Sequence, residues 1–197
     1  MLKYLSFLVL GALFLGASWA EAAESDDQSV FVFGGRYHTG HMEHILNPLG
    51  PFGLDYENNY VAGGGYQQFF LEGGNVRFGI EAGAAIGFGE DGSRGEVWGG
   101  LVGRYEGLQF GEINVAPSLT LGASAVTNTI GIESNRVAPG ADPHVLFYIA
   151  PEIAVSHDAH PETEVFFRIQ HRSGAWGAIA GMGDGHNAST VGVRWRF

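Results

Sequence analysis

Val191-Gly-Val-Arg-Trp-Arg-Phe197 is the stretch of sequence that decides the fold. Apolar residues at positions 191, 193, 195 and 197 alternate with glycine and arginine. Successive side chains of a strand point to opposite faces, so this stretch predicts a strand with one apolar face and one cationic face. A soluble protein would bury the apolar face in a core, whereas a membrane barrel turns it toward lipid.

The N-terminus has the three-part layout of a secretory signal peptide. Lys3 is followed by an apolar run over residues 4–16, which is too short for a comfortable membrane span, and then by small residues. We therefore expect residues 1–22 to be a signal peptide and residues 23–197 to form one outer-membrane domain. An uncleaved membrane anchor is the alternative. The aromatic pair Trp195 and Phe197 resembles the signal read by the machinery that inserts barrels into the outer membrane.

The composition narrows the class of protein further. The net charge of −11 argues against nucleic-acid binding, which requires a basic patch. The chain has no cysteine, so it has neither disulfides nor a thiol nucleophile. After the N-terminal run, no stretch of about 18 apolar residues follows that would predict a helical membrane span. The 32 glycines, together with many aromatic residues, favour strands packed closely around a narrow interior.

Eight strands are predicted from the alternation of apolar and polar residues and from the turn residues between them. The third is the clearest, because Phe78 and Ile80 belong to an apolar face and Arg77 and Glu81 to the opposite one. Charged residues on the second face suit a barrel with a polar interior better than an apolar sandwich core. The predicted strands cover residues 29–37, 60–71, 76–88, 97–106, 113–126, 145–156, 164–173 and 187–197.

The links between these strands predict an eight-stranded antiparallel transmembrane β-barrel. Long links follow the first, third, fifth and seventh strands, and short links follow the others, as in barrels whose long loops are all extracellular. The interior of a barrel this small is filled by side chains, and we expect its arginines to pair there with Glu81, Glu152 and other acids. These arginines are Arg168, Arg172, Arg194 and Arg196. The predicted long loops are residues 38–59, 89–95, 127–144 and 174–186.

The seventh predicted strand carries two polar residues on its lipid-facing side. Val165, Phe167 and Ile169 form the outward set, and the same parity turns His171 and Ser173 outward. Both lie at the end of the strand that leads into a long loop. An imidazole can act as a general base, and a hydroxyl is a nucleophile that such a base activates.

This His-x-Ser motif on the penultimate strand of an eight-stranded barrel resembles the lipid A 3-O-deacylase (PagL-type) family of Gram-negative outer membranes. The resemblance implies an outer-membrane ester hydrolase that removes the 3-O-linked acyl chain of lipid A in the outer leaflet. It implies Ser173 as the nucleophile and His171 as the base, with no metal or other cofactor. Lipid A and the surrounding membrane lipid would then be the partners of the protein.

The sequence departs from the family pattern at two positions. The family's asparagine after the catalytic serine is replaced by Gly174, whose backbone N–H is expected to hold the oxyanion. The family's late glutamate has no counterpart after Glu164. Asp184 is expected to orient His171 instead, with Asn187 as a neutral substitute. A related esterase acting on another lipid stays open, as does a non-catalytic barrel with a structural, adhesion or surface-protection role.

The first long loop contains His38, His41, Glu43 and His44. Imidazoles bind zinc and copper, but this spacing matches none of the strong zinc signatures. A solvated surface loop is therefore the favoured interpretation, and a metal site is the alternative.

Overall fold

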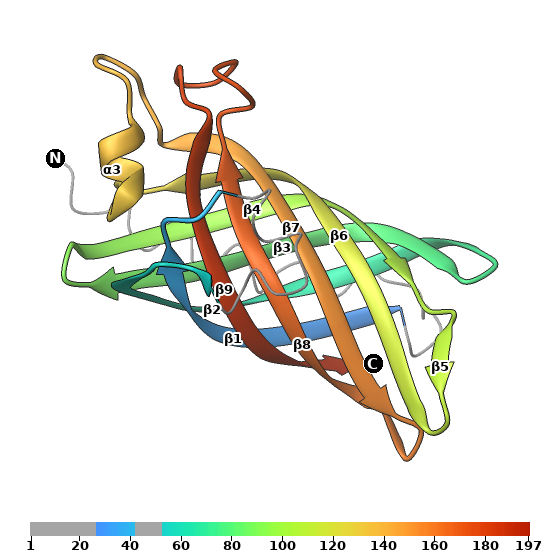
Figure 1. Cartoon of the computed structure of the whole chain (residues 1–197). Helices are drawn as coiled ribbons and strands as arrows, with labels where there is room; N and C mark the ends of the chain where they lie inside the picture. Colours follow the sequence, from blue (N-terminus) through green and yellow to red (C-terminus); the bar gives the residue numbers. More distant parts are fainter. Residues whose placement is uncertain (1–26, 42–52) are drawn as a thin grey trace, which may run out of the picture.

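The structure is a computed structural model that describes residues 27–41 and 53–197. The predicted signal peptide and the histidine-loop residues Glu43 and His44 lie outside the described residues. Most of the described chain is in strands, and α3 (Ile132–Arg136) is a short helix (Figure 1). No helix in the described part is long and apolar enough to cross a membrane.

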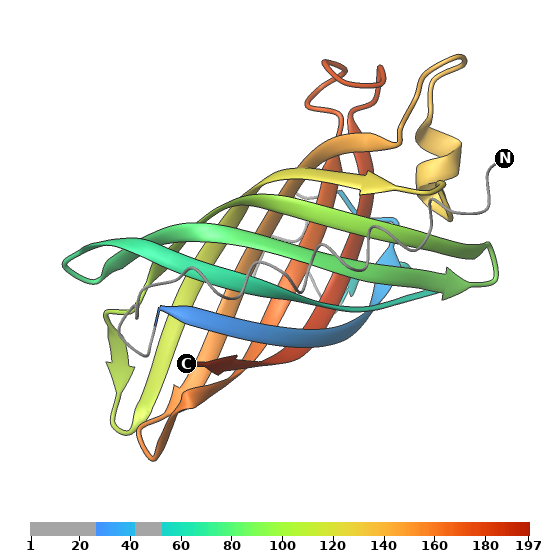
Figure 2. The same ribbon diagram turned by 180° about the vertical axis from the view of Figure 1, so that it is seen from behind.

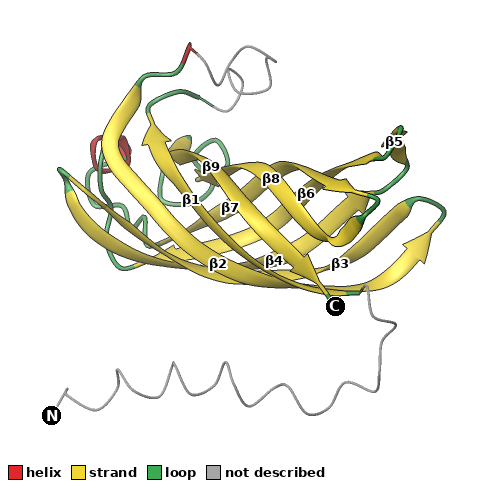
Figure 3. Ribbon diagram, turned by 90° about the horizontal axis from the view of Figure 1, so that it is seen from below, coloured by secondary structure: helices red, strands yellow, loops and turns green. Residues whose placement is uncertain are grey.

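The long strands form a closed antiparallel barrel, which confirms the predicted eight-stranded architecture. Neighbours in the sheet follow the order β4-β3-β2-β1-β9-β8-β7-β6, and pairing of β4 with β6 closes the ring. The strands run obliquely around the barrel (Figure 3), and β5 (Leu108–Phe110) adds a small hairpin to β6. The long strands are β1 (Gln28–His38), β2 (Tyr56–Gly73), β3 (Val76–Gly89), β4 (Gly92–Tyr105), β6 (Ile113–Val126), β7 (Val145–His157), β8 (His160–Ser173) and β9 (Asp184–Arg196).

The two ends of the barrel differ in their connections. The end of β1, the start of β2 and the links over residues 127–144 and 174–183 share one end of the barrel, which we call the loop end. The opposite end, which we call the turn end, has tight turns at residues 74–75 and 158–159 and the β5 hairpin. Figure 2 shows α3 and the loop after β8 together at the loop end, away from β5.

One predicted loop is wrong. Residues 89–95 were expected to be a long loop, but pairing of β3 with β4 continues to Gly89 and Gly92, so only Glu90 and Asp91 form the turn. The physical reason is Arg94, which is buried inside the barrel and pairs with Glu96 and with Glu133. A buried guanidinium needs such partners, and they hold this glycine-rich segment in the sheet.

The two faces of the wall follow the predicted alternation. On β3, Phe78 and Ile80 are about half exposed on the outside, whereas Arg77 and Glu81 are buried inside. The outer surface is therefore apolar and the lumen carries the charges, which is the arrangement of membrane barrels.

Ion pairs fill the middle of the lumen. Arg168 donates to both carboxylate oxygens of Glu81, at 2.8 and 2.7 Å, and its Nε donates to Glu152 at 2.8 Å. Arg194 continues the chain of contacts, donating to Glu152 at 2.9 Å and to Glu164 at 3.0 Å. These contacts confirm the predicted pairing for Arg168 and Arg194, and they satisfy charges that would be costly to bury alone. The other two predicted inward arginines pair with other acids, Arg172 with Glu133 and Arg196 with Glu164.

The loop over residues 127–144 closes the lumen at the loop end. Glu133 of α3 is fully buried and accepts a hydrogen bond of 2.5 Å from Arg172 on β8. Arg136, at the end of the same helix, donates to the carbonyl oxygens of Gly185 at 3.0 Å and Thr39 at 2.8 Å. The helix thus joins the lumen charges to the start of β9 and to the chain after β1.

Glycines facing the lumen leave room for large aromatic side chains. Trp98 on β4 lies against Gly83 on β3, and a Cβ added at position 83 would be 2.2 Å from the Trp98 ring. The indole is buried and donates from Nε1 to Glu81 at 2.9 Å, so it has little freedom to move aside.

We predict that Gly83→Ala lowers the free energy of unfolding by about 1–3 kcal/mol, because the new methyl group overpacks the lumen. Urea unfolding of the barrel refolded into lipid vesicles measures the change. Gly99→Ala is the matched control on the neighbouring strand, since a Cβ there meets only the Glu81 carbonyl oxygen at 3.7 Å. Equal effects of the two substitutions would contradict this explanation.

Candidate active site

The end of β8 and the start of β9 bring the predicted site residues together. His171 pairs with Asn187 and Ser173 pairs with Asp184, with a register shift between the two pairs. Gly185 and His186 on β9 therefore oppose one residue on β8. Such a bulge bends its strand and redirects side chains, and here it brings Asp184 opposite Ser173.

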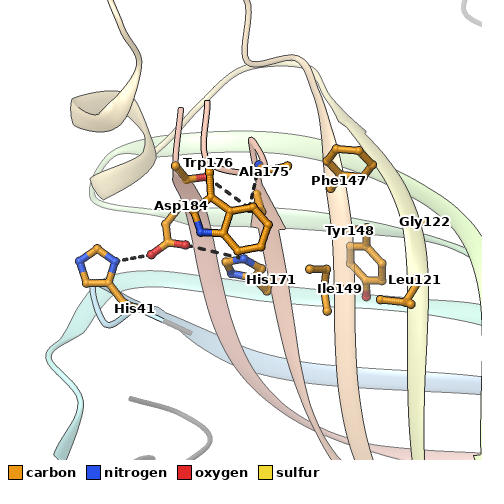
Figure 4. A pocket seen from close by; sticks show the side chains of 12 residues that line it. His41, Leu121, Gly122, Phe147, Tyr148, Ile149, His171, Ala175, Trp176 and Asp184 are labelled. Atoms are coloured by element: carbon orange, nitrogen blue, oxygen red, sulfur yellow. Dashed lines mark hydrogen bonds and ion pairs between the residues drawn. The ribbon is translucent and has the colours of Figure 1, made fainter. Parts of the chain in front are cut away.

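His171 and Ser173 lie on the outer face of the wall. Their cross-strand partners on β7 are Ile149 and Phe147, and directly paired residues of antiparallel strands share a face. Phe147 is 43% exposed on the outside, but His171 and Ser173 are only 2% and 9% exposed. The loop after β8 and the chain after β1 contribute residues around them (Figure 4), so the two side chains are sheltered.

A cavity of about 940 Å³ adjoins these side chains. One side of it is polar and the other is apolar, and Trp176, almost fully exposed, stands at its border. The apolar part lies on the outer surface of β6 and β7, where a lipid chain would contact the wall. The lining residues are His41, Leu121, Gly122, Phe147, Tyr148, Ile149, His171, Ser173, Ala175, Trp176, Gly183 and Asp184.

Asn187 determines which ring nitrogen of His171 carries the proton. Asn187 Nδ2 donates to the carbonyl oxygen of Gly40 at 2.7 Å, which fixes the orientation of the amide. Asn187 Oδ1 is then 2.6 Å from His171 Nδ1 and can only accept, so the hydrogen lies on Nδ1. The other ring nitrogen, Nε2, keeps its lone pair and is the atom able to take up a proton.

Asp184 lies on the other side of the imidazole from Asn187. Its Oδ1 is 3.8 Å from His171 Nε2, too far for a hydrogen bond, and its Oδ2 is paired with His41 Nδ1 (Figure 4). Of the two residues expected to orient His171, the structure therefore brings Asn187 to the orienting nitrogen and Asp184 to the reactive one.

Ser173 is held by the loop after β8. Its Oγ donates to the carbonyl oxygen of Gly183 at 3.3 Å and accepts from the Ala175 N–H at 3.1 Å. Within the described residues, no hydrogen bond joins Ser173 to His171. The hydroxyl hydrogen must therefore turn from Gly183 toward His171 before any proton transfer, and catalytic hydrogen bonds often tighten in this way only when substrate binds.

The backbone amide of Gly174 is already engaged in a hydrogen bond. Its N–H, predicted to hold an oxyanion, donates to the Gly183 carbonyl oxygen at 2.8 Å. A Cβ at position 174 would be 2.2 Å from the Met182 carbonyl oxygen, which explains why no larger residue stands there. The amide that reaches Ser173 is that of Ala175, a residue with a positive φ of 51°.

The histidines of the first loop are not arranged as a metal site in the described part of the chain. Across residues 27–41 and 53–197, no group of three or more His, Cys, Asp or Glu side chains is placed to hold a metal ion. His38 is buried beside Asn187, its partner on β9, and His41 pairs with Asp184. Sequence reasoning missed the contact of His41 with the site because it joins residues far apart in the chain.

Several solved structures are similar to this one. The outer membrane enzyme PagL matches with a TM-score of 0.54 and 14% sequence identity, over 86% of this chain and 99% of that one. Neisserial surface protein A matches with a TM-score of 0.48 and 10% identity, over 90% and 100% of the two chains. The attachment invasion locus protein Ail of Yersinia pestis matches with a TM-score of 0.43 and 8% identity, over 88% and 100%.

Comparison of the sequence alone finds no related protein or family. No protein-family model matches the chain, and no curated protein matches it significantly. The closed barrel and the match to PagL show that the protein has the fold of an eight-stranded outer-membrane barrel. At 14% identity this match establishes the fold alone. Any assignment of chemistry depends on the site.

The hydrogen bond between Asn187 and His171 predicts the tautomer of the imidazole. Asn187→Ala removes the acceptor at Nδ1, so the neutral ring should populate both tautomers. The ¹⁵N chemical shifts of histidine-labelled protein in detergent at about pH 8, above the usual imidazole pKa, report the tautomer. Asp184→Asn is the control, since it changes the Nε2 side only and should leave the proton on Nδ1. An unchanged tautomer in Asn187→Ala would contradict the assignment.

Proposed function

We propose that this protein is an ester hydrolase of the Gram-negative outer membrane that removes the 3-O-linked acyl chain of lipid A. The observation that carries the proposal is the position of His171 and Ser173, side by side on the outer wall and bordering a cavity with an apolar side. An enzyme whose substrate is a membrane lipid needs its reactive groups on the outside of the barrel, where the acyl chain lies.

Ser173 is the nucleophile of the proposed reaction. Its Oγ attacks the ester carbonyl carbon while His171 Nε2 takes the hydroxyl proton, and the tetrahedral intermediate forms. His171 then gives this proton to the departing sugar oxygen as the C–O bond breaks, leaving the acyl group on Ser173. A water molecule, deprotonated by His171 Nε2, then attacks the acyl carbonyl carbon. His171 returns this proton to Ser173 Oγ as the bond between Oγ and the acyl carbon breaks and the fatty acid leaves.

Two residues share the work that one carboxylate performs in a Ser-His-Asp triad. Asn187 holds the tautomer of His171 through Nδ1, as a triad acid does. Asp184, 3.8 Å from Nε2, supplies negative charge near the imidazolium that forms during the reaction. Its pairing with His41 positions that charge. The Ala175 N–H is the nearest oxyanion donor to Ser173, and the Gly174 N–H contributes once it leaves Gly183.

A non-catalytic barrel is the second candidate, and one observation favours it. The Ser173 hydroxyl donates to the Gly183 carbonyl oxygen rather than to His171. In that case the two residues are polar groups that hold the loop after β8 in place, and the protein has a structural, adhesion or surface-protection role.

We expect Ser173→Ala and His171→Ala each to lower deacylation by at least about 10⁴-fold, because each removes a group that makes or breaks a bond. Asp184→Asn should cost less, about 10²- to 10³-fold, because it removes a charge near His171 Nε2 and leaves the tautomer unchanged. Mass spectrometry of lipid A, incubated with the purified protein in detergent, measures the loss of one acyl chain. Heat-modifiability on a gel confirms that each variant is folded.

The outcomes separate the candidates. Wild-type protein that leaves lipid A and other ester lipids intact would support the non-catalytic barrel. Removal of an acyl chain from another lipid alone would keep the Ser-His mechanism and change the substrate.

The proposed orientation places the loop end outside the cell. Because the chain has no cysteine, single cysteines report accessibility without background. Asp142→Cys, in the exposed part of the loop after β6, should react with a membrane-impermeant maleimide on intact cells. Ala159→Cys, in the exposed turn after β7, should react only after the outer membrane is opened. The reverse pattern would contradict the orientation.

A further inference from the structure

Arg36 is a cation on the outer wall of the barrel. On β1, Arg36 shares parity with Val30 and Val32, which are exposed on the outside. The next residue, Tyr37, is buried in the lumen, so the side chain of Arg36 points outward. The other arginines of the described strands face the lumen and form ion pairs with carboxylates. Arg36 forms no ion pair within the described residues, so its charge is available on the outside.

The guanidinium of Arg36 is held in one place. Its Nε donates to the Glu57 carbonyl oxygen at 2.6 Å and its Nη2 donates to Asn58 Oδ1 at 2.9 Å. It lies over the rings of Tyr56 and Tyr60, 5.7 and 5.5 Å from their centroids. Glu57 and Asn58 are nearer the loop end than Tyr60, which pairs with Arg36, so the side chain of Arg36 reaches along the wall toward the loop end.

The contacts of Arg36 leave its charge uncompensated. Both acceptors are neutral oxygens, and they use only two of the N–H donors that a guanidinium carries. An arginine on the lipid face of a barrel costs free energy that depends on its depth in the membrane. An anion that accepts from the remaining donors would offset that cost, and a phosphate oxygen suits the planar donor geometry.

A groove of about 490 Å³ begins at Arg36 and crosses the outer faces of β2, β1, β9 and β8. Gly34 and Ser189 leave space at its floor, and Phe167 and Val191 supply apolar surface. It has the width of several strands and lies on the face that an acyl chain would contact.

The groove is continuous with the wall that carries the candidate active site. Arg36 pairs with Ser189, Ser189 pairs with Ile169, and His171 follows two residues toward the loop end. At strand spacings of about 4.8 Å and rises of about 3.4 Å per residue, Arg36 and His171 are roughly 12 Å apart along the wall. One lipid molecule can span this distance.

We propose that Arg36, held by Glu57 and Asn58 and flanked by Tyr56 and Tyr60, binds the phosphate of an outer-leaflet lipid headgroup, with an acyl chain of that lipid in the groove. Phosphate binding does not depend on hydrolysis. The corollary, that this contact directs the ester toward Ser173, rests on the proposed function.

Native mass spectrometry of the folded, full barrel in detergent tests the proposal. The protein is titrated with bisphosphorylated lipid A, with the same lipid A after enzymatic removal of its phosphates, and with inorganic phosphate. We expect the wild type and Ser173→Ala to bind the phosphorylated lipid about tenfold more tightly than the dephosphorylated lipid. Arg36→Gln should lose this preference and Arg36→Lys should keep part of it. Ile80→Gln, which places the same polar side chain on another part of the outer wall, should keep all of it.

The proposal is overturned if Arg36→Gln keeps the full preference, if the wild type has none, or if inorganic phosphate binds as well as the phosphorylated lipid. The comparison of the two lipids on wild-type protein tests it even if Arg36→Gln fails to fold. Hydrolysis is followed in the same samples. A phosphate preference without hydrolysis would contradict the proposed function alone, and hydrolysis without a preference would contradict this inference alone.

Discussion

The pairing of Arg168 with Glu81 and Glu152 across the lumen is the contact on which the rest of the structure depends. It satisfies charges that the closed barrel would otherwise bury alone, and it fills the space through which a pore would have to run. Since the interior is occupied by side chains that satisfy one another, the surfaces left for binding are the wall and the loop end. The position of His171 and Ser173 on the outer face follows from this division.

Near the loop end, an irregularity in the pairing of β8 with β9 positions the residues of the site. A bulge in β9 brings Asp184 opposite Ser173, while the regular pairing just below it keeps Asn187 opposite His171. One imidazole therefore has a neutral acceptor at Nδ1 and a carboxylate near Nε2. A strictly regular hairpin would have turned one of these two polar residues into the lumen, because parity alternates along a strand.

Most of the barrel could be predicted from sequence, because alternation is a local property. The strand over residues 113–126 was predicted with its observed bounds, and the lumen pairs of Arg168 followed from parity. The turn after β3 was missed because Arg94 is held in the sheet by Glu133, a partner from another loop. The residues of the site were predicted, but most of their contacts were not. The bulge in β9 changes the parity of the strand, and the local sequence pattern does not reveal a bulge. The occupied Gly174 N–H and the contact of His41 likewise depend on how the loops fold back.

Each of the three residues after β1 contacts a different residue at the loop end. Thr39 accepts from Arg136 through its backbone carbonyl, Gly40 accepts from Asn187 in the same manner, and His41 contacts Asp184 through its side chain. Two of these three contacts use atoms that every amino acid possesses. Contacts made by backbone atoms can keep their geometry while the amino acids at those positions change. Sequence comparison then detects little similarity even where the geometry of the site is the same.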